Sequence, residues 1–227
     1  MSYPSIQEVA QQVKSWDFTI NLPEEIDGFV KEIQSNIDGQ VLHICRYFNV
    51  GLKAQLDIIY TVETFDYVVV RTMGINTYRD VRYVYKERDV FAQKVLEALP
   101  RIIKNMEHPD SVNLGAMVAE HGILTWEYGN SLPAAIGDFE LYIKPKNAIE
   151  HINGSVIIID YTDFKRKDQF VVYYNRLRNQ FFAELKIAGV FRDSKKFDSH
   201  NLKTLQSKLE KNLKDSLNYV MKSSHEM

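Results

Sequence analysis

The order of hydrophobic segments in the first half of the chain recurs in the second half. Three strand-like segments match segments 99 to 103 positions later, and a long amphipathic helix follows each set. The matched segments are residues 40–44 with 139–143, 56–60 with 155–159 and 67–71 with 170–174, and the helices are expected near 89–106 and 199–222. The match is one of pattern rather than identity. It predicts a duplicated fold with two similar surfaces and a seam, where ligands often bind.

The first forty residues predict two helices. Apolar residues at Ile6, Val9 and Val13 share one helical face, and Ser5 with Glu8 forms the pattern of a capping box. A second helix is expected from about residue 23 to residue 37, after which Asp38-Gly39 ends it. The apolar stripe of this second helix would be Ile26, Phe29, Val30, Ile33 and Ile37.

The next segments predict a four-stranded antiparallel meander followed by a helix. Strands are expected at residues 40–48, 54–62, 67–73 and 79–86, and alternation within 54–62 predicts one solvated sheet face. The helix over 89–106 contains Pro100, which is expected to kink or split it.

The second half predicts a similar order. A short helix is expected at 112–121. Residues 123–128 fit an extended segment or a helix, and the extended segment is favoured. Strands are expected at 138–144, 154–161 and 169–175. Residues 180–190 fit a strand or a helix, and analogy with 79–86 favours the strand. The last helix carries a stripe expected to pack on its own sheet rather than in a coiled coil. The stripe is Leu202, Leu205, Leu209, Leu213, Leu217 and Val220.

These patterns predict an α+β fold. It consists of two pseudo-repeated antiparallel four-stranded meanders, each followed by a long amphipathic helix, with helices at the N-terminus. The boundary is expected at 108–110, which gives units 1–108 and 109–227 or one compact pseudo-symmetric domain. The pattern leaves open whether the two halves share one sheet.

Composition narrows the classes of function. The formal net charge is −2 and the pI about 6.3, which disfavours a dedicated nucleic-acid-binding protein. No apolar run reaches the roughly 18 residues of a membrane span, and residues 1–16 do not resemble a secretory signal, so a cytoplasmic location is expected. The single cysteine, Cys45, excludes an internal disulfide, and its apolar surroundings favour burial over reactivity.

Known catalytic and cofactor motifs are absent from the sequence. The sequence contains no glycine-rich phosphate loop, no HExxH, no paired CxxC and no GxSxG. A metal site from Glu120, His121 and His151 is conceivable, but scattered histidines more often serve as surface or hydrogen-bonded residues. His43 and Cys45 are two residues apart on one strand and are expected on the same sheet face, but residues at that spacing are too far apart for a nucleophile pair. We therefore expect no catalytic residue, no metal and no cofactor.

Aromatic and basic residues alternate in one segment, 78–86, and recur more loosely at 173–178. Tyrosine and arginine dominate binding hot spots because both combine apolar area with hydrogen bonding. The alternative is an ordinary half-exposed strand whose arginines pair with Asp80 or Glu87. The predicted binding residues are Arg79, Arg82, Tyr83, Tyr85, Tyr173, Arg176 and Arg178.

The sequence favours a non-enzymatic cytosolic protein-binding or adaptor protein that uses this aromatic and basic sheet face or the seam between the halves. A protein partner or a homo-oligomer is expected, nucleic acid and membrane are not. The alternatives are a small-ligand-binding protein with an apolar cavity between sheet and helix, or an enzyme without a local motif. The identity of the partner and the oligomeric state stay open.

Overall fold

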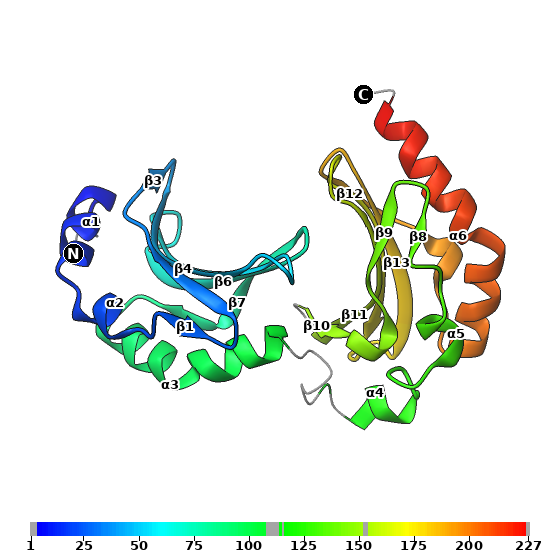
Figure 1. Ribbon diagram of the computed structural model, residues 1–227, viewed down its shortest axis with the longest axis horizontal. Coiled ribbons are helices and arrows are strands. Elements are labelled where there is room, and N and C mark those ends of the chain that lie inside the picture. Colours follow the sequence, from blue (N-terminus) through cyan, green and yellow to red (C-terminus); the bar gives the residue numbers. More distant parts are fainter. Residues whose placement is uncertain (1–3, 108–113, 115, 152–153, 226–227) are drawn as a thin grey trace. The chain divides into compact units, whose positions relative to one another are not determined.

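The computed structural model describes residues 4–107, 114, 116–151 and 154–225. The chain divides into two compact units, Met1–Glu107 (unit 1) and His108–Met227 (unit 2). Each unit has an antiparallel seven-stranded sheet with a long helix against one face (Figure 1). The predicted α+β class and the antiparallel sheets are confirmed. None of the described helices combines the length and apolar character needed to cross a membrane.

Unit 1 begins with two short helices and ends with a long one. Its sheet has the order β1-β2-β4-β5-β6-β7, and β3 pairs with β4 off this path. The elements are α1 (Ile6–Lys14), α2 (Asp17–Asn21), β1 (Glu25–Ile26), β2 (Phe29–Ile33), β3 (Ile37–Asp38), β4 (Val41–Asn49), β5 (Ala54–Thr61), β6 (Asp66–Met73), β7 (Asn76–Tyr85) and α3 (Arg88–Glu107).

Unit 2 has the same strand order, β8-β9-β11-β12-β13-β14, with β10 paired to β11. Each sheet therefore has six strands on its main path and one beside it, and the predicted count of four is wrong. The elements are α4 (Ala116–Glu120), α5 (Glu127–Asn130), β8 (Ala135–Ile136), β9 (Phe139–Ile143), η2 (Pro145–Asn147), β10 (Ile149–Glu150), β11 (Ser155–Asp163), β12 (Asp168–Asn175), β13 (Gln180–Ile187), β14 (Val190–Asp193), η4 (Lys195–Phe197) and α6 (Leu202–His225).

The predicted helix at 23–37 is wrong, because this segment forms β1, β2 and β3. Asp27 and Gly28 have φ values of 46° and 74°, which make a tight turn and pair Ile26 with Phe29. The apolar residues happen to follow helical spacing. Ile33, which belongs to the apolar stripe of the predicted helix, retains 52% of its accessible surface. The stripe is therefore not buried as one face.

Four smaller predictions have different outcomes. Residues 123–128 do not form a strand, because Trp126 is the N-terminal cap of α5. Pro100 does not split α3, which continues to Glu107. Residues 180–187 form the strand β13, as the sequence favoured. Of the short helix expected at 112–121, α4 is present, while 112, 113 and 115 lie outside the described residues.

The equivalence between the halves differs from the predicted one by one strand. The sequence pattern matches residues 139–143 with 40–44, because the apolar spacing of the β1–β2 hairpin resembles that of a helix. The strand pairings show that β9 corresponds to β2, 110 positions earlier. From β4 onward each strand and the long helix begin 114 positions before their counterparts, so that β4 corresponds to β11, β5 to β12, β6 to β13, β7 to β14 and α3 to α6.

Local details recur at this spacing. A register shift interrupts β4 between His43 and Cys45, and another interrupts β11 between Ile157 and Ile159. Left-handed residues occur at equivalent places in three turns, namely Lys53 and Lys167, Phe65 and Asn179, and Gly74 and Ala188. A further spacing of 110 relates Trp16, Leu22, Pro23, Ile26 and Phe29 to Trp126, Leu132, Pro133, Ile136 and Phe139.

Each core lies between the sheet and its long helix. In unit 1 the rings of Trp16, Phe18, Tyr67 and Phe91 pack with centroids 4.5 to 6.5 Å apart. In unit 2 the leucine stripe of α6 lies in one cluster with strand residues such as Phe170. The stripe therefore packs on its own sheet.

Candidate binding groove on the sheet of unit 1

A groove lies on the face of the unit 1 sheet opposite the core, here called the outer face. The groove has a volume of about 540 Å³, and every lining residue comes from a strand between β3 and β7. Figure 1 shows α3 on the other side of this sheet. The lining residues are Asp38, Val41, His43, Gln55, Asp57, Ile59, Val70, Thr72, Thr77, Tyr78 and Arg79.

The strand register brings five outer-face residues into one row. Glu32, Arg46, Asp57, Val70 and Arg79 are successive cross-strand partners on β2, β4, β5, β6 and β7. Directly opposed side chains in an antiparallel sheet lie close enough to interact. The row therefore sets alternating charges beside an apolar position at the centre of the groove.

Asp57 is satisfied within the protein. Its side chain is buried, Arg46 Nε donates to its Oδ1 at 3.0 Å, and Gln55 Nε2 donates to its Oδ2 at 2.5 Å. Arg46 also approaches Glu32 at 3.7 Å. The Asp57 carboxylate therefore links β4 and β5 at the floor of the groove, and Arg46 and Gln55 compete with any ligand for its oxygens.

Arg79 is far more accessible. Its side chain is 45% exposed and pairs at 3.2 Å with Glu63, whose side chain is 62% exposed. Such exposed ion pairs contribute little stability, about 0–1 kcal/mol. An anionic group of a ligand can therefore replace Glu63 on Arg79 at small cost.

The remaining lining is apolar or uncharged. Ile59 is buried, Val41 and Val70 are half-buried, and the hydroxyls of Thr72 and Thr77 lie 2.9 Å apart in a hydrogen bond. An apolar floor with a few polar groups at its margins is typical of a binding site.

His43 adds a polar atom to the lining. Its Nδ1 is buried and has no hydrogen-bond partner among the described residues. The register shift in β4 turns His43 toward the outer face, opposite Ile59, and Cys45 toward the core, opposite Ile58. The two side chains therefore point to opposite faces, contrary to the expectation that they share one. Burial raises the pKa of the Cys45 thiol to about 12, which disfavours a thiolate there.

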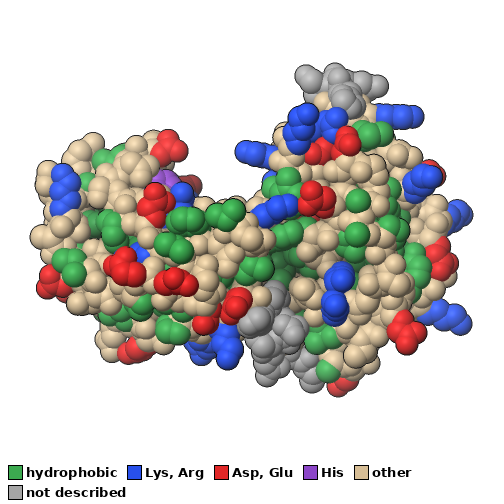
Figure 2. Space-filling view, viewed as in Figure 1, with side chains coloured by type: hydrophobic (Ala, Val, Ile, Leu, Met, Phe, Trp, Pro, Cys, Tyr) green, Lys and Arg blue, Asp and Glu red, His purple; other side chains and the backbone are tan. Residues whose placement is uncertain are grey.

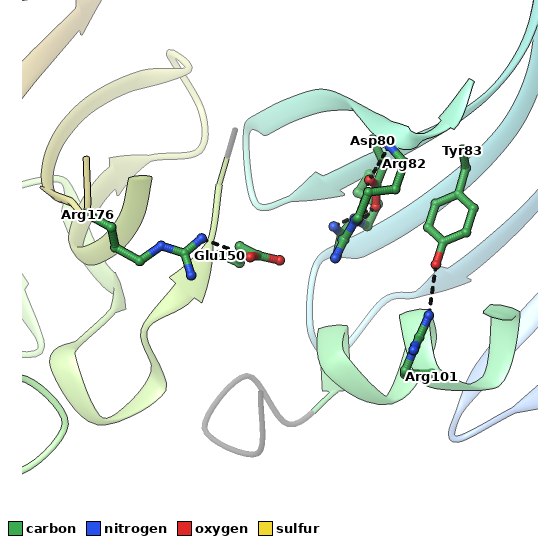
Figure 3. Close-up of polar contacts among 7 residues, drawn as sticks. Asp80, Arg82, Tyr83, Arg101, Glu150 and Arg176 are labelled. Carbon is green, nitrogen blue, oxygen red and sulfur yellow. Dashed lines mark hydrogen bonds and ion pairs between the residues drawn. The ribbon is translucent and has the colours of Figure 1, made fainter. Parts of the chain in front are cut away.

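Of the residues predicted from the aromatic and basic segment of β7, only Arg79 lines the groove. Arg82 binds both carboxylate oxygens of Asp80 at 2.9 Å, and Tyr83 is buried and accepts a hydrogen bond from Arg101 at 3.3 Å (Figure 3). Tyr85 is half-buried, with its ring 6.5 Å from that of Phe91.

The predicted residues of unit 2 serve other contacts. Tyr173 is buried and stacks on Phe182, with ring centroids 5.0 Å apart. Arg176 binds Glu150 at 3.1 Å (Figure 3) and also donates to two backbone carbonyls. Arg178 lies in the turn after β12, and its backbone N–H donates to Asn175. The structural counterpart of 76–85 is β14, not 173–178.

The histidines of the metal site suggested by the sequence make other contacts among the described residues. No group of three His, Cys, Asp or Glu side chains there is arranged to hold a metal ion. His121 hydrogen-bonds Asn179 at 2.7 Å, and the ring of His151 packs 5.6 Å from that of Tyr173. Figure 2 shows acidic and basic side chains interspersed over the visible face of each unit.

Comparisons with protein-family models, curated proteins and solved structures find no match for this chain.

The groove could not be predicted from the sequence pattern, because its residues come from five strands and are brought together only by the strand register. Alternation within 54–62 was the available signal. Asp57 and Thr61 on its polar side are buried, however, so this face is not simply solvated.

Proposed function

We propose that this chain is a non-enzymatic protein-binding or adaptor protein that holds its partner in the groove of unit 1. The observation that carries the proposal is a groove of about 540 Å³ with an apolar floor and polar margins, on the sheet face opposite α3. A seam between the two units is not needed for this proposal.

The dimensions of the groove favour a polypeptide. Its lining extends over five strands, or four interstrand steps of about 4.8 Å, which gives a width of roughly 19 Å. An extended segment of about six residues covers that distance at roughly 3.3 Å per residue. Gln55, Thr72 and Thr77 along the groove can hydrogen-bond to the backbone of such a segment.

The chemistry of the lining supports binding rather than catalysis. Nucleophilic catalysis needs a nucleophile and a base in mutual contact. Among the lining residues, Asp57 is bound by Arg46 and Gln55, and Thr72 and Thr77 bond each other. These side chains therefore have structural partners in place of a reacting pair.

We also propose that the two units arose by internal duplication and that the protein works in the cytoplasm. The shared strand order and the recurring register shifts support the first idea. A single buried cysteine is compatible with a reducing compartment.

A comparison of two proteins in native lysate tests the binding surface. The wild type and a groove-filled variant, Ile59→Tyr with Thr72→Lys and Thr77→Phe, are used as bait at equal loading. We expect a partner on the wild type and its loss on the variant. A partner retained equally by both proteins, or no partner on either, would refute binding in the groove.

The runner-up function is binding of a small ligand. The volume of the groove lies within the roughly 300–1,000 Å³ of small-molecule sites. The site differs from the cavity between sheet and helix that the sequence suggested. Native mass spectrometry after mild purification distinguishes the two functions, since a bound molecule below peptide mass favours this second function.

A further inference from the structure

The groove of unit 1 can be compared with the same positions on the sheet of unit 2. The spacing of 114 residues and the matching registers define the equivalent pairs. At four lining positions unit 2 carries a larger side chain. The pairs are Ile59 and Tyr173, Val70 and Glu184, Thr72 and Lys186, and Thr77 and Phe191.

The larger side chains of unit 2 pack on one another. Tyr173 stacks on Phe182, which stands where unit 1 has Val68, with an interplanar angle of 16°. The ammonium group of Lys186 lies 5.1 Å from the centre of the Phe191 ring. The same backbone arrangement thus carries aromatic rings in unit 2 at places where unit 1 has Ile59 and Thr77.

We propose that the groove of unit 1 receives an aromatic side chain of a polypeptide partner, with a carboxylate beside it in the partner sequence bound to Arg79. This inference rests on the proposed protein-binding function and specifies its ligand. The ring lies on Ile59 and Val70, in the space that Tyr173 and Phe191 occupy on the equivalent surface.

Charge complementarity selects the second element of the ligand. Arg79 is the arginine of the lining, and its exposed partner Glu63 is easily replaced. A guanidinium group binds a carboxylate through two parallel hydrogen bonds. Asp57 does not oppose this binding strongly, since Arg46 pairs with it and Gln55 donates a hydrogen bond to it. Asp38, the other carboxylate of the lining, lies on β3, at the margin of the groove away from Arg79 on β7. The partner segment is therefore aromatic and acidic.

Selection from a library of random hexapeptides tests this ligand. The full-length protein is the target, and binders of the groove-filled variant are removed beforehand. We expect the remaining peptides to be enriched in an aromatic residue next to Asp or Glu, and their affinity to fall at least tenfold on Arg79→Gln. Val50→Tyr is the matched control, since Val50 is 79% exposed and outside the lining. This control should bind like the wild type.

The outcomes separate the ligand from the function. A partner captured from lysate through the groove, together with selected peptides that lack aromatic or acidic residues, would overturn this inference and leave the proposed function standing. Absence of a captured partner on the wild type, or equal capture by the groove-filled variant, would remove both. Circular dichroism checks that the variant folds, and Arg79→Gln alone tests the carboxylate if the triple variant does not. Equal affinity of acidic peptides for wild type and Arg79→Gln would overturn the role of Arg79.

Discussion

The hydroxyl of Tyr161 donates a hydrogen bond of 2.7 Å to the carbonyl oxygen of Pro133. Tyr47 makes the equivalent bond to Pro23 at 2.5 Å. Both tyrosines are fully buried, and each bond ties the segment before the first hairpin to a central strand. The same tertiary contact thus occurs within each unit. It joins residues 24 positions apart in unit 1 and 28 positions apart in unit 2.

Removing either hydroxyl should destabilise only the unit that contains it. We expect Tyr47→Phe and Tyr161→Phe each to lower the free energy of unfolding by about 0.5–1.5 kcal/mol, the net value of a typical hydrogen bond. Each unit contains one of the two tryptophans, Trp16 and Trp126. Urea unfolding of Trp126→Phe and Trp16→Phe backgrounds therefore reports each unit separately. Tyr219→Phe, at a half-exposed position, should change neither transition.

Tyrosine ionisation should destabilise the protein at alkaline pH. Burial raises the pKa of Tyr67 and Tyr161 to about 12, above the ordinary value of about 10. The folded state then binds more protons than the unfolded state between these pH values. Stability is therefore fully present below about pH 10 and declines as the pH rises through about 12. Urea unfolding at successive pH values should show this decline, and Tyr161→Phe should make it shallower. An identical slope in wild type and variant would contradict the assignment.

Asp80 and Arg71 form a buried ion pair on the core side of unit 1. Arg71 Nη2 lies 2.7 Å from Asp80 Oδ2, and the side chains are 7% and 3% exposed. Asp80→Ala leaves a buried guanidinium group without its carboxylate, and we expect a loss of about 3–5 kcal/mol in urea unfolding. Removal of the exposed pair by Arg79→Gln should cost less than about 1 kcal/mol. Similar losses for the two variants would show that burial does not distinguish the pairs.

The same ion pair predicts a response to acid. Burial acts to raise the pKa of Asp80, but the hydrogen bonds and charges of Arg82 and Arg71 outweigh burial and lower it below its ordinary value of 3.8. The contribution of this carboxylate is therefore present above pH 3.8 and is lost as the pH falls through the lower folded value. Asp80→Asn should flatten the acid limb of the stability profile, whereas an unchanged limb would exclude this contribution.

Cys45 should react with thiol reagents only when unit 1 opens. The side chain is fully buried, and burial raises the pKa of its thiol to about 12, so little thiolate forms at neutral pH. With a chromogenic disulfide reagent we expect slow reaction of the native protein and fast reaction in denaturant. Asp80→Ala should accelerate the native reaction because it destabilises the unit. Rapid labelling of the native wild type would mean that Cys45 is accessible.

The strands that alternate or are rich in β-branched residues could be predicted from the sequence. Segments 54–61 and 66–73 lie within one residue of their predicted ends, because both are long and bounded by turns. Segment 23–37 could not be predicted from spacing alone. Its apolar residues follow a helical period, yet the left-handed Asp27 and Gly28 impose a hairpin. This single error displaced the predicted equivalence of the two halves by one strand.

The candidate site depends on the strand register, which local sequence patterns do not reveal. Arg79 was predicted as a binding residue from its aromatic neighbours, but its neighbours in the groove are Val70 and Thr77. Tyr83 and Tyr173 looked equally suitable and are buried. Which arginines and tyrosines remain accessible depends on the strand register and on the face to which each residue points.

Site-specific photocrosslinking tests the central claim most directly, namely that unit 1 binds a partner in its groove. A benzophenone amino acid replaces either Asp38, an exposed residue at the margin of the groove, or Val50, which is 79% exposed and outside the lining, and each protein is irradiated in native lysate. We expect a covalent protein adduct from position 38 that an aromatic acidic peptide displaces, and none from position 50. Equal adducts from both positions, or none from position 38, would contradict the account.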